Sequence, residues 1–145
     1  MHWNIFQVTA SRETMVEAVL TRLGFDVFQP LEPRFQSVSR HTKRRKVIYV
    51  PLIPRAVFVK DNGTEMLDLL SIRHVRGIAR NSQDEPWCIP HREMVQFKAA
   101  LENWTSGLIK DGKGQAIKKE PIKLGDLSRM DEIMRIMFGI EVENG

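Results

Sequence analysis

Residues 39–46, SRHTKRRK, form the most basic stretch of this 145-residue chain. Five of these eight residues are lysine or arginine and none is acidic. A patch of this kind binds polyanions such as nucleic-acid phosphates through charge. The alternative is a solvated hairpin tip whose charge prevents strands from pairing edge to edge. The chain carries a formal net charge of +4 at pH 7, and the excess lies within its first 60 residues.

Residues that commonly carry catalysis or bind metals do not form a recognisable set. The four histidines lie far apart in the sequence, at His2, His41, His74 and His91. The single cysteine, Cys88, excludes an internal disulfide, and its place beside a tryptophan favours a small buried residue. The adjacent Asp84 and Glu85 indicate a polar turn, and no Gly-rich phosphate loop is present. We therefore expect no enzyme activity, no cofactor and no metal.

Aromatic residues offer a second route to nucleic acid, because an exposed ring can stack on an unpaired base. Phe6, Phe28, Phe35 and Phe58 lie on different predicted strands. They would serve equally well in a hydrophobic core, and we favour the core. Tyr49 has a weaker claim to burial.

The segment PLIPRAVFV, residues 51–59, places two prolines directly before a run of apolar residues. Proline has no backbone donor, so Pro51 and Pro54 predict an extended approach to a strand that begins near Arg55. The apolar run predicts a central strand covered on both faces, and the Asp-Asn-Gly sequence at 61–63 predicts the turn that ends it.

The remaining elements follow from periodicity and from turn residues. Ser11 is the expected cap of the first helix, Gly24 its left-handed end, and Pro30 and Pro33 the breaks after the second strand. Gly77 indicates a bulge or a close backbone approach in a later strand. The predicted elements are strand 3–8, helix 12–23, strand 25–30, hairpin arms 35–38 and 47–50, strand 55–60, helix 64–70, strand 75–80, extended segment 87–89 and helix 90–104.

This order predicts an α/β fold, namely a ferredoxin-like sandwich with a mostly antiparallel sheet flanked by about three helices. We expect a domain at 1–104, a linker at 105–120, where glycines alternate with lysines, and a C-terminal segment at 121–145. Apolar residues from Leu127 to Met137 recur at helical spacing in that segment. No apolar run is long enough to span a membrane and no secretory signal is seen, so we expect a cytoplasmic protein.

Several motifs together resemble the NusG N-terminal domain of the NusG/RfaH family of transcription elongation factors. PLIPRAVFV is similar to the family signature P-L-F-P-x-Y-x-F-V. A Trp-led strand (WNIF, 3–6) and a strand that ends in proline (FQP, 28–30) precede it. A V-x-G-V element follows as VRGI (75–78), and an I-P pair follows at 89–90. The similarity covers about residues 3–104, with departures from the signature at Ile53, Arg55 and Ala56.

The resemblance implies a factor that docks on the clamp coiled coil of the largest subunit of RNA polymerase and modulates pausing or termination. It implies polymerase contacts at Phe6, Ile53, Pro54, Arg55 and Phe58. It also implies contacts to non-template DNA or nascent RNA at Arg12, Arg40, Lys43, Arg44, Arg45, Arg73, His74 and Arg76. We expect a monomer that acts in transcription antitermination or elongation, as a DNA-binding transcription regulator with no membrane partner.

The C-terminal segment departs further from the family. Family members carry a C-terminal KOW barrel, and IKLGD at 122–126 resembles its start. Too few residues follow to complete it, so we expect that region to be incomplete or replaced.

Two other classes of function stay open at this point. The first is a nucleic-acid-binding module of the same fold that does not contact polymerase, which predicts salt-sensitive binding to free RNA or DNA. The second is an enzyme such as a metal-dependent nuclease, for which the sequence offers no set of residues.

Overall fold

The computed structural model describes residues 2–39, 42–63, 66–112, 121–125 and 127–143. The chain divides into two compact units, Met1–Pro30 with Ile53–Met94 and Leu31–Leu52 with Val95–Gly145. The elements in chain order are β1 (His2–Val8), α1 (Glu13–Arg22), β2 (Val27–Phe28), β3 (Leu31–Ser39), β4 (Thr42–Pro51), β5 (Ala56–Lys60), the 3₁₀ helix η1 (Met66–Ser71), β6 (Val75–Ile78), β7 (Ile89–Pro90), α2 (His91–Gly112), β8 (Ile122–Lys123), α3 (Ser128–Glu132), the π-helical turn η2 (Ile133–Met137) and β9 (Val142–Glu143).

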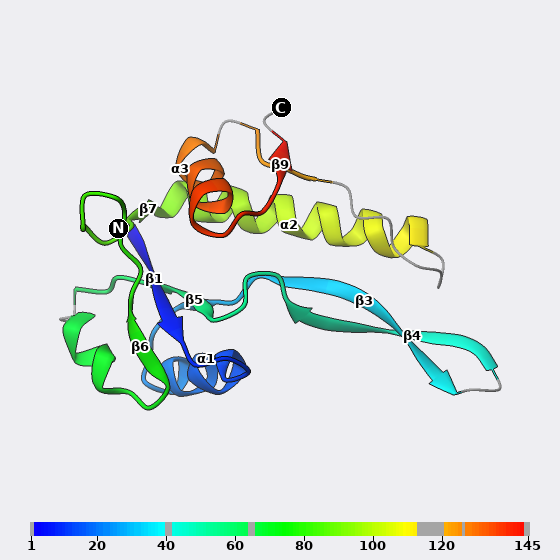
Figure 1. Ribbon diagram of the computed structural model, residues 1–145, viewed down its shortest axis with the longest axis horizontal. Coiled ribbons are helices and arrows are strands. Elements are labelled where there is room, and N and C mark those ends of the chain that lie inside the picture. Colours follow the sequence, from blue (N-terminus) through cyan, green and yellow to red (C-terminus); the bar gives the residue numbers. More distant parts are fainter. Residues whose placement is uncertain (1, 40–41, 64–65, 113–120, 126, 144–145) are drawn as a thin grey trace. The chain divides into compact units, whose positions relative to one another are not determined.

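The first unit is built on a five-stranded sheet in the order β2-β5-β1-β6, with β7 also paired to β1. Every strand pair in this sheet is antiparallel. β1 is central, since β5 pairs with one of its edges and β6 and β7 pair with the other (Figure 1). The predicted α/β class with a mostly antiparallel sheet is confirmed.

The two central strands bury side chains on both faces of the sheet. Phe6 lies opposite Val57 in the register, and both belong to one core cluster with Val16 and Leu20 of α1. α1 therefore covers this face, as Figure 1 shows. Phe58 lies opposite Ile5 and points to the other face, because successive side chains on a strand alternate. All four residues from Ala56 to Val59 are buried, as the sequence predicted for a central strand.

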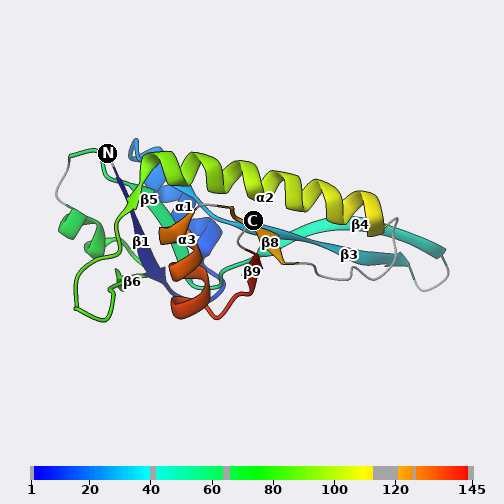
Figure 2. The ribbon, with the colours of Figure 1, turned by 90° about the horizontal axis from the view of Figure 1, so that it is seen from above.

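The prolines before β5 precede a strand as predicted, but residues 52–55 form a bend and a turn in place of the expected extended approach, and Pro33 also differs from expectation. Pro51 is the last residue of β4, and β5 begins at Ala56, close to the predicted start. Pro33 was predicted to break the chain, yet it lies within β3 opposite Tyr49. β3 and β4 form a two-stranded sheet (Figure 2), and every second residue of such a ribbon points its N–H away from the partner strand. A missing N–H is tolerated there.

Of the expected turn and cap residues, two are confirmed and one is wrong. Gly24 (φ +93) follows α1, and Gly63 (φ +86) donates its N–H to Asp61 Oδ1 at 2.8 Å, so both predictions are confirmed. The predicted cap at Ser11 is wrong. α1 has Arg12 at its N-cap position without a side-chain cap, while Ser11 has φ +66 and donates its N–H to Glu13 Oε1 at 2.9 Å.

Three further helical segments differ in part from expectation. η1 is a 3₁₀ helix, and its expected cap, Thr64, lies outside the described residues. α2 continues to Gly112 instead of ending near Trp104, into the segment expected to be a linker. The expected C-terminal helix is present as α3 and η2, and a short parallel pair, β8 with β9, flanks it. Among the described residues, no helix has the length and apolarity to cross a bilayer.

Candidate functional site

The end of β1 brings together three segments that are distant in sequence. The N–H of Val8 donates to the carbonyl oxygen of Arg55 at 2.9 Å, and the N–H of Thr9 donates to that of His74 at 2.9 Å. The N–H of Arg12 returns to the carbonyl oxygen of Thr9 at 3.0 Å. The β1–α1 connection, the start of β5 and the start of β6 therefore meet at one end of the sheet.

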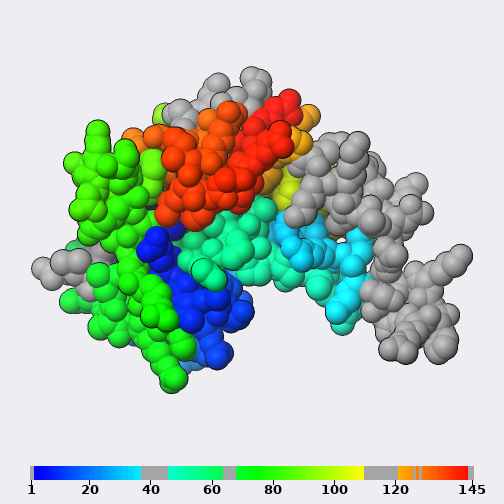
Figure 3. All heavy atoms as spheres, in the orientation of Figure 1, coloured from blue at the N-terminus to red at the C-terminus, as the bar shows by residue number. Residues whose placement is uncertain are grey.

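This end of the sheet carries three arginines and one histidine that we call the basic cluster: Arg12, Arg73, His74 and Arg76. Partial desolvation lowers the pKa of His74, and the positive charges of Arg73, Arg12 and Arg76 lower it further. Hydrogen bonds bring the members together, since Thr9 Oγ1 accepts the Nε–H of Arg76 at 3.1 Å and the backbone of Thr9 bonds to both His74 and Arg12. The arginines are exposed, and within the described residues no ion pair joins them to a carboxylate. In Figure 3 the N-terminal segment and the β6 segment form one continuous surface.

The backbone at the same end is strained. Three of the four non-glycine residues with positive φ in the described chain are Ser11 (+66), Arg55 (+65) and His74 (+74). Each L-residue in this left-handed region costs about 1–2 kcal/mol. Strain of this kind gathers where a site needs an unusual backbone path.

Arg76 reaches the cluster through an irregularity in β6. Gln7 pairs with Gly77, but Val8 pairs with Val75, so Arg76 is an extra residue on the β6 side. A bulge re-aims the side chain that it carries. Of the two readings that Gly77 offered, the bulge is confirmed, and its inserted residue belongs to the basic cluster.

The five residues expected to contact polymerase do not share one exposed surface. Phe6 and Ile53 are 1% exposed and Phe58 is 0% exposed, whereas Pro54 and Arg55 are exposed. Phe6 and Phe58 point to opposite faces of the sheet, and the Phe58 ring packs on Phe28 with centroids 6.4 Å apart.

The basic stretch at 39–46 adds little to this geometry. Arg40 lies outside the described residues, and so do the side chains of Lys43, Arg44 and Arg45, although their backbone forms part of β4. Their proposed contacts to nucleic acid remain predictions.

The other residues that the sequence offered for metal binding or catalysis are the histidines, Cys88, and Asp84 with Glu85. The described residues contain no group of three or more His, Cys, Asp or Glu side chains arranged to hold a metal. Cys88 is exposed, so its expected burial is wrong. The polar turn at Asp84 and Glu85 is confirmed, since Asn81 Oδ1 accepts the N–H of Glu85 at 3.0 Å.

Two of the remaining histidines, His2 and His91, have partners of their own. His2 Nε2 lies 3.2 Å from Asp61 Oδ2, and His91 Nδ1 accepts the indole N–H of Trp3 at 3.0 Å. His41 lies outside the described residues.

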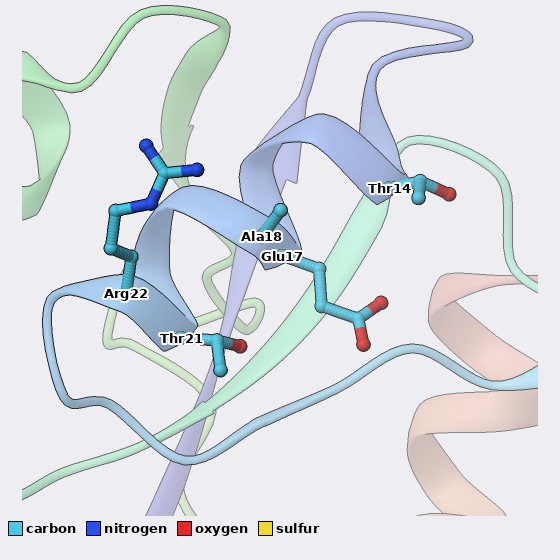
Figure 4. A pocket seen from close by; sticks show the side chains of 5 residues that line it. All are labelled: Thr14, Glu17, Ala18, Thr21 and Arg22. Carbon is cyan, nitrogen blue, oxygen red and sulfur yellow. The ribbon is translucent and has the colours of Figure 1, made fainter.

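A separate feature of the first unit is an open depression on α1. It is lined by Thr14, Glu17, Ala18, Thr21 and Arg22 (Figure 4). Burial raises the pKa of the Glu17 carboxyl. All five lining residues come from one helix, so the depression lacks the converging polar groups of a catalytic site.

Comparison with known proteins gives one family. The sequence model of the family described as transcription termination factor nusG matches residues 1–98. The matched range contains the whole basic cluster and all five residues of the expected polymerase contact. No curated protein matches the chain.

Proposed function

Because the chain belongs to the NusG family of transcription factors, we propose that it is an elongation or antitermination factor that modulates pausing or termination by RNA polymerase. Proteins of this family are non-enzymatic transcription factors that bind RNA polymerase. The observation that carries the proposal for this chain is the basic cluster, where hydrogen bonds bring together four groups from two distant segments and no ion pair joins its arginines to a carboxylate among the described residues.

In this proposal the double-proline segment docks on polymerase, at the clamp coiled coil of the largest subunit. Pro54 and Arg55 make the direct contact, since both are exposed. Phe6 and Phe58 support the segment from within the sheet. Ile53 is 1% exposed, so it contacts polymerase only after the side chains around it move.

The basic cluster then faces nucleic acid. Its arginines bind phosphate oxygens of the non-template DNA strand or of the nascent RNA, which supplies affinity with little sequence information. A factor that binds the elongating polymerase more tightly than the paused enzyme shifts the population toward elongation by that difference in affinity. No covalent step is required.

The test is capture of purified RNA polymerase by the wild-type chain and by Arg55→Glu. Charge reversal at an exposed docking residue is expected to weaken capture about tenfold or more. Arg22→Glu is the matched control, because Arg22 is an exposed arginine at the end of α1. Ile53→Asp is less informative, because a carboxylate at a buried position destabilises the fold itself. Equal capture by wild type and Arg55→Glu would remove Arg55 from the docking surface.

A second candidate follows from the same unpaired cations. If the wild-type chain captures no polymerase but binds single-stranded DNA or RNA with strong salt dependence, it is a nucleic-acid-binding module of NusG fold.

A further inference from the structure

The hydroxyl of Thr9 lies at the centre of the hydrogen bonds in the basic cluster. Its Oγ1 accepts the Nε–H of Arg76 at 3.1 Å and donates to the carbonyl oxygen of His74 at 3.4 Å. The N–H of Thr9 donates to the same His74 oxygen, and its own carbonyl accepts the N–H of Arg12. One half-buried residue thus contacts three of the four members of the cluster.

The contact to Arg76 is long-range in sequence and specific in geometry. The bulge places Arg76 outside the regular ladder, and the hydroxyl then holds its side chain at Nε. An arginine carries five N–H donors, of which Nε supplies one and the two terminal nitrogens supply four. Within the described residues, the structure gives these terminal nitrogens no protein acceptor. They are available to two oxygens of one phosphate.

We propose that Thr9 is the positioning residue of the basic cluster, which orders the Arg76 guanidinium for bidentate contact with a phosphodiester of a single-stranded nucleic acid. This inference rests on the nucleic-acid contact in the proposed function. A free arginine side chain loses rotamer entropy when it binds, and a side chain already held at Nε loses less of it. Thr9 therefore adds affinity without itself contacting the ligand.

The test compares Thr9→Val, which removes the hydroxyl at nearly constant shape, with Thr9→Ser, which keeps it. Binding of a short labelled oligothymidylate is measured by fluorescence anisotropy at low salt. We expect Thr9→Val to weaken binding about three- to tenfold, and Thr9→Ser to restore it to within about twofold of wild type. Thr21→Val makes the same chemical change on the exposed side of α1 and is expected to leave affinity unchanged.

Two further measurements separate positioning from a merely structural role. In a double-mutant cycle, Thr9→Val is expected to add no further loss in an Arg76→Gln background. In NMR spectra of the free protein, the Arg76 Nε–H signal should exchange slowly with solvent in wild type and in Thr9→Ser, and quickly in Thr9→Val. Full additivity in the cycle, or equal exchange in all three proteins, would overturn the assignment.

Failure of the proposed function has a different signature. If wild type binds no oligonucleotide, the nucleic-acid contact is wrong and so is the role of Thr9 in it. The exchange measurement then still reports whether Thr9 holds Arg76. If wild type binds and Thr9→Val binds equally well, the nucleic-acid contact stands and the positioning role is excluded.

Discussion

Replacing Arg55 with glycine is expected to stabilise the protein while weakening its proposed contact with polymerase. Arg55 is exposed, has φ +65 and directly precedes β5. Its carbonyl oxygen accepts the N–H of Val8 at 2.9 Å, so the sheet holds this residue in its strained conformation. An L-residue in this region costs about 1–2 kcal/mol, and glycine removes that cost.

The gain is smaller than the strain because glycine also increases the entropy of the unfolded chain. That effect opposes folding by about 0.4–1 kcal/mol. The net expectation for Arg55→Gly is an increase of about 0–1.6 kcal/mol in the free energy of unfolding, centred on about 0.8 kcal/mol, from the difference of these two terms. Urea denaturation followed by tryptophan fluorescence measures it, as a higher midpoint with an unchanged slope.

Arg22→Gly is the matched control, since it makes the same substitution at another exposed arginine. Arg22 ends α1 in a helical conformation, where glycine costs up to about 1 kcal/mol relative to a good helix former. It also loses the favourable position of a cation at a helix C-terminus. The two substitutions should therefore change stability in opposite directions.

The reasoning is refuted if Arg55→Gly lowers the urea midpoint as Arg22→Gly does. That result would mean that the Arg55 side chain contributes more to stability than its backbone strain costs. If Arg55→Gly raises stability and also loses polymerase capture, the strain is retained for binding, as is common at functional sites.

Two predictions concern ionisable groups. The pKa of His74 is lowered in the folded protein, so protonation as the pH falls below its usual 6.5 costs stability, while the added charge strengthens polyanion binding. The rise in oligonucleotide affinity toward acidic pH should be reduced in His74→Asn, because asparagine does not gain a proton. Asparagine is chosen because it tolerates the positive φ of this position. The pKa of Glu17 is raised by burial, so its charge opposes folding at neutral pH and the opposition fades as the pH falls through that pKa. Glu17→Gln should therefore raise the melting temperature slightly at pH 7 and leave it unchanged well below pH 4.5; a loss at pH 7 would show that the charge is stabilising.

The sequence predicted the centre of the sheet because several local rules agreed there. Apolar residues, two prolines without donors and a turn with glycine at positive φ all place a buried strand at β5. Local rules failed at other positions, where the structure depends on more than the adjacent sequence. Pro33 reads as a break in any single strand, and it is tolerated because β3 belongs to a two-stranded ribbon. Ser11 has the side chain of a cap, yet it adopts a left-handed conformation in which its N–H donates to Glu13 Oε1.

The candidate site was only partly accessible from the sequence for the same reason. The family resemblance pointed to Arg12 and to the group at Arg73, His74 and Arg76, but their convergence depends on β1 pairing with β6. Thr9 had no signal at all in the sequence, because one threonine at a strand end is ordinary. Its importance in the proposal follows from hydrogen bonds to residues more than sixty positions away.

The end of β1 combines two features that each oppose folding. Three residues hold strained backbone conformations, and three guanidinium groups lie close enough to depress the pKa of an imidazole. Within the described residues, no carboxylate offsets that repulsion through an ion pair. A polyanion bound there would reduce the repulsion only in the folded protein, so by linkage its binding also stabilises the fold. The charge repulsion that makes this end of the sheet costly in the free chain therefore favours an anionic partner.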